Sequence, residues 1–177
     1  ITVIGINDTP VAQNDVGVIT EDSTLTVTNG TNANESGGSY NATGEHSGDV
    51  INTSSGSHQD SDADASASLT VTQIKKNGGS NSSVSSGSSY NSSGTSVTGT
   101  YGTLTIGADG SYTYAATADA ADGIASGETA DDVFVYTLSD GTETTTANIT
   151  ITIIGANDNP TAQNDVGVIM ELSLIHI

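Results

Sequence analysis

The chain has 177 residues, a length that suits one β-sandwich-sized domain with its flanks. Its 21 acidic residues stand against two basic ones, and the formal net charge of −19 excludes nucleic acid and anionic membrane surfaces as partners, because like charges repel. The absence of cysteine excludes disulfides and thiol chemistry, and no apolar run is long enough to insert across a membrane.

Alternating apolar and small polar residues predict short strands along the chain. In the N-terminal half the predicted strands are 16–19, 25–28 and 69–74. In the C-terminal half, strands 101–106 and 111–115 flank Asp109-Gly110, and strands 132–138 and 147–154 flank Asp140-Gly141. Each Asp-Gly pair predicts a hairpin turn, since glycine accepts the positive φ that tight turns require. No segment has a useful 3.6-residue apolar period, so the predicted fold class is all-β, an antiparallel sandwich.

Two regions, 29–61 and 77–100, consist largely of Ser, Gly and Asn. Such a composition buries too little apolar surface to offset the entropy lost on ordering, so both regions are predicted to be long surface loops. An alternative for the second region is a poorly paired extra hairpin around Val84, Tyr90 and Val97. Because long loops are either functional or simply flexible, a ligand-binding loop is a further interpretation.

The chain also repeats its own boundary. The sequence VIGINDTPVAQNDVGVI at 3–19 returns as IIGANDNPTAQNDVGVI at 153–169, and aligning Ile1 with Ile151 gives a period of 151 − 1 = 150 residues. A tandem array repeats its boundaries because each unit must pass the chain to the next in the same geometry. We therefore interpret 1–10 as the end of a preceding repeat with its linker, 11–156 as one repeat, and 157–171 as the next linker and the start of the next repeat. Residues 172–177 break the pattern and are interpreted as a non-native tail.

Acidic residues collect at strand ends and in the repeated boundary, and Asp60, Asp62 and Asp64 alternate with small residues. On an extended backbone this alternation would send all three carboxylates to one side. Oxygen ligands that converge from loops are what Ca²⁺ needs. The DSDAD sequence lacks the glycine and the distant glutamate of an EF-hand loop, which excludes that motif. Solvated loop acids are the alternative for any single residue, but the lack of other counter-charge favours Ca²⁺ for the set.

The segment from Gly102 to Asp165 resembles a VCBS repeat, a cadherin-like bacterial module found in tandem in very large secreted adhesins. The motifs that carry the resemblance are, in order, GTLT, ADGSYTY, GE, DVFVYTLSDG and ITIIGANDNP. The resemblance implies an Ig/cadherin-like β-sandwich that acts as a calcium-dependent extender, in a surface protein exported by a type I (RTX-type) system.

The similarity to cadherins also implies a ligand set. Asn157-Asp158-Asn159-Pro160 resembles the cadherin linker whose oxygens hold calcium between domains, Asp62-Ala63-Asp64 resembles the cadherin Asp-Ala-Asp pair, and Glu21 resembles an acidic residue near the first cadherin strand. The ligands implied for the junction before this unit are Asn7, Asp8, Asp62 and Asp64. Those implied for the junction after it are Glu21, Asp132, Asn157, Asp158 and Asn159. The chain departs from the cadherin pattern at Gly5 and Gly155, where cadherins place a further Asp, and at Thr9, which replaces the second Asn.

Together these patterns predict a calcium-stiffened structural extender of a large bacterial surface adhesin, active in cell adhesion and biofilm formation. It is expected to be a monomer outside the cell, with neighbouring repeats of the same chain as its partners and no catalytic residues. The alternative is a glycan- or surface-binding module that uses the polar loops with Tyr40, Tyr90 and Tyr101. A third hypothesis is a glycosidase with paired carboxylates such as Glu128 and Asp131, but nothing in the sequence marks a buried acid or a cleft.

Overall fold

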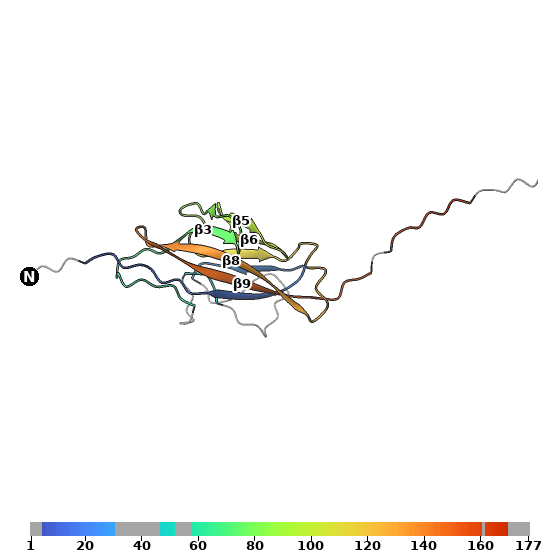
Figure 1. Ribbon diagram of the computed structural model, residues 1–177, viewed down its shortest axis with the longest axis horizontal. Coiled ribbons are helices and arrows are strands. Elements are labelled where there is room, and N and C mark those ends of the chain that lie inside the picture. The colour runs from blue at the N-terminus through green and yellow to red at the C-terminus, as the bar shows by residue number, and fades with distance from the viewer. Residues whose placement is uncertain (1–4, 31–46, 52–57, 161, 170–177) are drawn as a thin grey trace, which may run out of the picture.

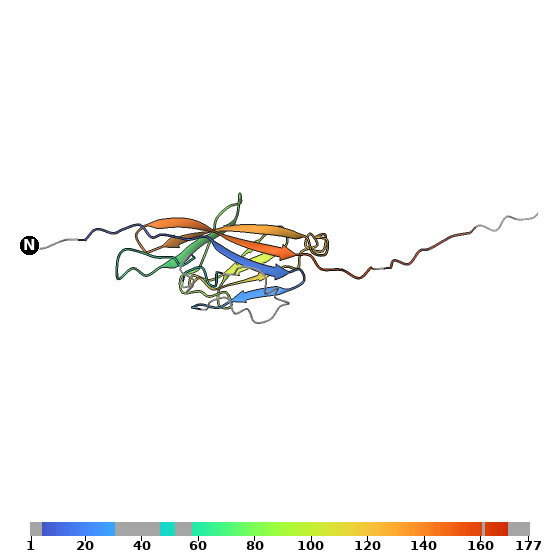
Figure 2. The ribbon, with the colours of Figure 1, turned by 90° about the horizontal axis from the view of Figure 1, so that it is seen from below.

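The computed structural model describes residues 5–30, 47–51, 58–160 and 162–169. Strands in these residues form two packed sheets (Figures 1 and 2). The order in the five-stranded sheet is β1 (Asp15–Thr20), β9 (Thr144–Ile154), β8 (Thr129–Ser139), β3 (Thr70–Lys76) and β4 (Ser82–Ser83). The order in the four-stranded sheet is β2 (Thr24–Val27), β7 (Tyr112–Ala115), β6 (Thr103–Ile106) and β5 (Thr95–Thr98). The predicted all-β sandwich is confirmed, and no described helix has the length and hydropathy of a membrane span.

All seven predicted strands are present, with bounds shifted by a few residues. The two Asp-Gly turns lie where predicted, and Gly110 and Gly141 have φ angles of 87° and 96°. One pairing departs from an antiparallel sheet, because β1 runs parallel to β9 with Ile19 opposite Ile153. The first strand of the domain therefore lies along its last strand.

Period-two alternation produces the core. On β8 and β9 every second side chain is fully buried, namely Phe134, Tyr136, Leu138, Ile149, Ile151 and Ile153. Leu25, Leu104, Ile106, Tyr112 and Tyr114 face them from the other sheet. The Tyr114 and Phe134 rings meet edge to face at 6.1 Å between centroids, and this contact joins the two sheets.

The Ser-rich region 77–100 is not the long surface loop that its composition predicts, nor a single extra hairpin. Here β4 pairs with β3 at the edge of one sheet, and β5 pairs with β6 at the edge of the other. Val84 is buried and Val97 packs against the core. Strand pairing uses backbone groups, so a Ser/Thr-rich segment can extend a sheet edge that is already built. Of the region 29–61, the segment 47–51 is buried, while 31–46 and 52–57 lie outside the described residues.

The chain enters the sandwich at one end and leaves from the opposite end (Figures 1 and 2). We call the first end the N-terminal pole, formed by residues 5–10, 60–67 and the β8–β9 turn. The C-terminal pole is formed by the β1–β2 turn and the end of β9. Strands β8 and β9 have 11 residues each and run between the poles. At roughly 3.3 Å per residue each strand is about 35 Å long, so the unit spaces its two linkers along the strand direction.

Candidate functional site

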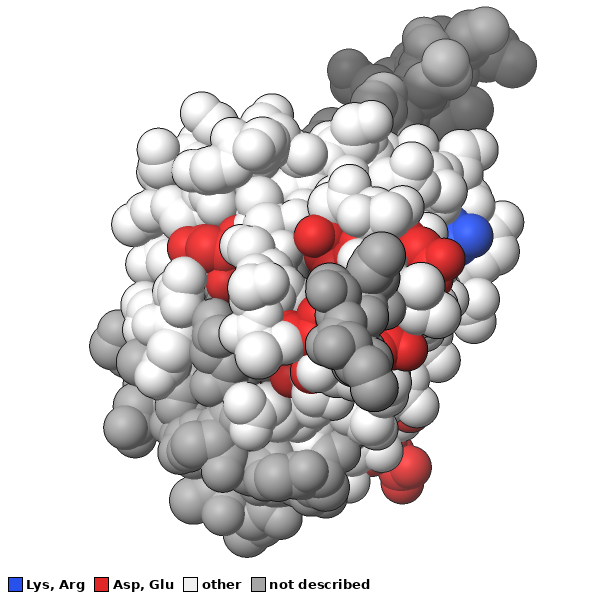
Figure 3. Space-filling model, turned by 90° about the vertical axis from the view of Figure 1, so that its left-hand side faces the viewer, with Lys and Arg blue, Asp and Glu red and all other residues white. Residues whose placement is uncertain are grey.

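At the N-terminal pole, the incoming linker lies against two acidic segments of the sandwich. The backbone amide of Asp8 donates to the Asp64 carboxylate at 2.9 Å, and the Asn7 side-chain amide donates to Asp140 Oδ2 at 2.9 Å. The Thr9 hydroxyl donates to the Glu143 carboxylate. Acidic side chains accordingly gather around the point where the chain enters (Figure 3).

Asp62 and Asp64 form a local turn beside this linker. The Asp64 amide donates to Asp62 Oδ1 at 2.7 Å, whereas Asp62 Oδ2 is buried and has no hydrogen-bond partner among the described residues. A buried carboxylate oxygen without a donor is costly unless a cation or proton satisfies it. Four predicted ligands, Asn7, Asp8, Asp62 and Asp64, are thus brought to one pole.

Two further acids at this pole, Asp140 and Glu143, are not among the ligands that the cadherin resemblance implies. Asp140 accepts hydrogen bonds from the amides of Thr142 and Glu143, and the Glu143 amide, followed by the Asn7 side chain, holds the pKa of Asp140 below its ordinary value. Asp140-Gly141 is recognisable in the sequence as a hairpin turn. Only the sheet topology places that turn against the linker, because β8 and β9 reverse at the N-terminal pole.

Asp60 has different contacts from Asp62 and Asp64, although all three line one polar groove. The segment bends after Ser61, which pairs with Val11 across an isolated bridge, and it is not a continuous strand. Asp60 is 3% exposed and accepts hydrogen bonds from the Gln13 amide and the Tyr136 hydroxyl. Its carboxylate is therefore held by donors from the chain before β1 and from β8.

At the C-terminal pole, Glu21 holds the outgoing chain. Its side chain is 3% exposed, its backbone amide donates to the Ile154 carbonyl, and its Oε1 accepts from the Ala156 amide. Oε2 is buried without a hydrogen-bond partner among the described residues. The C-terminal pole thus also presents one unpartnered carboxylate oxygen beside a linker.

The outgoing linker repeats the local geometry of the incoming one. The Asn157 side chain donates to the Asp158 carbonyl at 3.2 Å, as the Asn7 side chain donates to the Asp8 carbonyl at 3.0 Å. Asn157, Asp158 and Asn159 are exposed. The predicted ligands of the second junction thus extend from the C-terminal pole, close in sequence to the residues that Glu21 contacts.

Asp132 is placed differently from the other predicted ligands, between the two sheets. It is 1% exposed and accepts hydrogen bonds from the Thr100 and Tyr101 amides at 2.6 and 2.9 Å and from the Tyr114 hydroxyl at 2.7 Å. Burial, followed by the hydrogen bond to Asp132, raises the pKa of Tyr114, so this hydroxyl stays a donor. Three protein donors thus already serve this carboxylate, which ties β8 to the β5–β6 turn.

The donor chemistry at both poles fits calcium, because all the groups are carboxylate, amide or carbonyl oxygens. Asp62 Oδ2 and Glu21 Oε2, which have no hydrogen-bond partner among the described residues, are available as ligands. Within the described ranges, however, no three acidic or histidine side chains are placed to hold a metal ion together.

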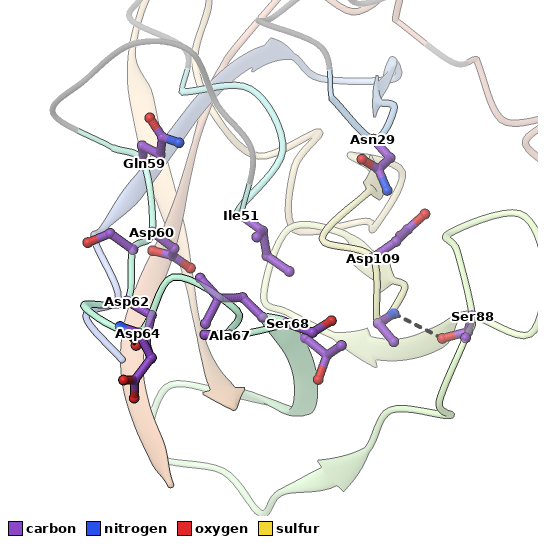
Figure 4. A pocket seen from close by; sticks show the side chains of 15 residues that line it. Asn29, Ile51, Gln59, Asp60, Asp62, Asp64, Ala67, Ser68, Ser88 and Asp109 are labelled. Atoms are coloured by element: carbon purple, nitrogen blue, oxygen red, sulfur yellow. Dashed lines mark hydrogen bonds between the residues drawn. The ribbon is translucent and has the colours of Figure 1, made fainter. Parts of the chain in front are cut away.

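A polar groove of about 690 Å³ opens beside the N-terminal pole, with Asp60, Asp62 and Asp64 on one wall and Ser88 and Asp109 across from them (Figure 4). None of its described lining residues is aromatic. Tyr101 packs against the core, Tyr90 is half-buried, and Tyr40 lies outside the described residues. The groove thus lacks the aromatic platform on which sugar rings stack, and glycan binding stays a prediction.

A two-sheet sandwich with linkers at opposite poles defines an immunoglobulin-like module. A family model, the bacterial cadherin-like domain, matches residues 7–155, which cover the sandwich and its first linker. The chain belongs to this family, which confirms the cadherin-like resemblance. Bacterial cadherin-like domains are structural, adhesion-type modules of extracellular proteins, and cadherin-like domains generally bind calcium. A search of curated proteins found no match.

Proposed function

We propose that this unit is a calcium-stiffened spacer in a tandem array, part of a large bacterial surface adhesin exported by a type I system. The observation that carries the proposal is the placement of the repeated linker. One copy lies at each pole, and each pole has a buried carboxylate oxygen with no donor among the described residues, Asp62 Oδ2 at one and Glu21 Oε2 at the other. Units joined through these linkers follow one another end to end.

The two copies of the boundary differ in burial in a way that supports a following unit. Ile19 is 2% exposed inside the sandwich, whereas its counterpart Ile169 is 97% exposed. Pro10 is buried and Pro160 is exposed. The second copy has the sequence of a first strand without the sheet that would bury it, which a following repeat would supply.

The incomplete ligand shell at each pole has the same explanation. In an array, Asn7 and Asp8 of this unit correspond to Asn157 and Asp158 of the preceding unit. Each linker therefore lies between the C-terminal pole of one unit, which carries Glu21, and the N-terminal pole of the next, which carries Asp62, Asp64 and Asp140. Calcium takes six to eight oxygens, whereas in the described part of one unit no three acidic or histidine side chains are placed to hold a metal ion together. Ligands from two units would complete the shell, and the shared ion would join the two domains.

Calcium would also determine where the array stiffens. Extracellular modules bind Ca²⁺ at about 10⁻⁴–10⁻³ M, so such an array is flexible in a low-calcium cytosol and rigid outside the cell. An ion present at about 100 times its dissociation constant stabilises a site by about 2.7 kcal/mol. That is a large share of the total stability of a domain, about 5–15 kcal/mol.

The test is small-angle X-ray scattering of a two-unit protein joined by the native linker, in Ca²⁺ and in EDTA. Calcium is expected to increase the maximum dimension and narrow the distribution of shapes. Asp62→Asn in the second unit should weaken the response, while Asp131→Asn, which removes the same charge from an exposed site near the start of β8, should not. Equal flexibility with and without calcium would refute the proposal.

A further inference from the structure

Asp15, at the start of β1, is a fully buried carboxylate. Its side chain is 0% exposed, and neither Oδ1 nor Oδ2 has a partner among the described residues. The charged groups that act on it, Asp60 and Asp49, are both negative. Nothing in the junction proposal uses this residue.

The hydroxyl groups of Ser47 and Tyr136 lie beside Asp15 and oppose the rise in its pKa, but each hydroxyl also has other acceptors. Ser47 Oγ accepts from the Val16 amide and donates to the Val16 carbonyl. Tyr136 Oη has a single hydrogen, and its acceptors include the Gln13 carbonyl and the Asp60 carboxylate. Burial, opposed by these hydroxyls and reinforced by Asp60, raises the pKa of Asp15 to about 9, and burial raises that of Asp60 to about 7.

The Tyr136 hydroxyl also stands at the centre of an unusual group of oxygens. It lies 2.9 Å from Gln13 O, 3.5 Å from Val50 O, and 3.1 and 3.0 Å from the two carboxylate oxygens of Asp60. One hydrogen satisfies one acceptor, so the remaining pairs set lone pair against lone pair in a buried site. All four distances are measured from the Tyr136 hydroxyl, so they place two carbonyl oxygens and both Asp60 carboxylate oxygens around one point in a buried site.

We propose that Asp15 and Asp60, with the carbonyl oxygens of Gln13 and Val50, form an intradomain site for one Ca²⁺. Two carboxylates match the charge of the ion, and the all-oxygen, irregular donor set suits Ca²⁺ better than Mg²⁺, which demands near-octahedral geometry. The Tyr136 hydroxyl lies against this site and orients the Asp60 carboxylate. The ion would fasten β1, the segment 47–51 and the loop at Asp60 to β8. The site lies within one unit and does not depend on the junction ions.

Terbium luminescence tests the position of the site, because Tb³⁺ replaces Ca²⁺ and emits when a nearby aromatic ring is excited. The chain has six tyrosines and no tryptophan, so tyrosine is the sensitiser. We expect Tyr136→Phe to remove most of the sensitised emission. Glu21→Gln, at the opposite pole, should leave that emission unchanged. Undiminished emission from Tyr136→Phe would overturn the proposed position.

Ion counting by native mass spectrometry and equilibrium dialysis tests the ligand. Asp15→Asn should bind one Ca²⁺ fewer than the wild-type chain, whereas Asp131→Asn should bind the same number. Asparagine has the shape of a protonated Asp15 and needs no counter-charge, so this variant is expected to fold in EDTA, which circular dichroism checks. If it does not fold, the terbium result decides. Unchanged ion number and affinity in a folded Asp15→Asn variant would overturn the proposal.

Discussion

Replacing Asp132 by alanine distinguishes two roles for this carboxylate, a structural role within the unit and a role as a metal ligand. The carboxylate accepts hydrogen bonds from the Thr100 and Tyr101 amides and from the Tyr114 hydroxyl, all within the unit. If these bonds are its role, the loss on substitution must be the same with calcium and without it. If Asp132 is also a calcium ligand, the loss must be larger in calcium.

The magnitude follows from the burial of the three donors. Tyr114 is fully buried, so a hydroxyl left without an acceptor costs about 1–3 kcal/mol. Thr100 and Tyr101 lie nearer the surface, where water can replace part of the lost bond, so each contributes about 1 kcal/mol. The total is about 3–5 kcal/mol. Each kcal/mol lowers the Tm of a domain of this size by roughly 2–4 °C, so the expected decrease is roughly 10 °C.

The assay is thermal and urea unfolding of Asp132→Ala in EDTA and in Ca²⁺. The matched control is Asp131→Ala, because Asp131 is exposed and its carboxylate accepts a hydrogen bond from the Thr152 hydroxyl at 2.7 Å. The control should change the free energy of unfolding by less than about 0.5 kcal/mol. A wild-type-like Asp132→Ala in EDTA, or a loss confined to calcium, would refute the structural reasoning.

Three further predictions concern other parts of the unit. A methyl group on Gly99 would overlap the Asp132 carboxylate, so Gly99→Ala should lower the free energy of unfolding by about 1–3 kcal/mol in urea; unchanged stability would contradict this packing. In EDTA, the buried Asp15 has a pKa near 9 and keeps its proton in the folded state, whereas the unfolded chain releases this proton above about pH 4. The protonated Asp15 therefore stabilises the fold fully below about pH 4, and this stabilisation is lost as the pH rises toward 9. Scans of Tm against pH should show this decline in the wild type and a shallower one in Asp15→Asn; identical slopes would contradict it. In the two-unit protein, Glu21→Gln in the first unit should reduce the calcium-dependent rise in Tm, whereas Asp22→Asn, at its exposed neighbour, should not; equal effects would argue against a specific role for Glu21.

Much of the sandwich could be predicted because its strands carry their own signals. Alternation on 132–138 and 147–154 identifies both the strands and the faces that they bury, and the two Asp-Gly pairs identify the turns. Strands β4 and β5 could not be predicted in the same way. They are short Ser/Thr-rich edges that form because a neighbouring strand offers backbone groups, and a composition-based argument does not include that neighbour.

The candidate site could likewise be predicted only in part. The repeated boundary identified the linker acids without a structure, since a joint used in every unit recurs at the period of the array. The sequence could not show which acidic side chains are exposed and which are buried, because this depends on contacts across the fold. Asp131 and Asp132 are adjacent in the sequence, yet strand alternation turns one to solvent and the other between the sheets.

The sequence by itself determined the class of fold, the repeat period and the acidic character of the linkers, because strand alternation, turn chemistry and net charge are local or additive properties of the chain. Tertiary structure alone decided which acids meet. It brought the Asp140 turn to the incoming linker, placed Glu21 on the outgoing one, and buried Asp15 beside Asp60 and Tyr136. The physical reason is that hydrogen bonding and desolvation act between residues far apart in the chain, and only the packing of two sheets sets those distances.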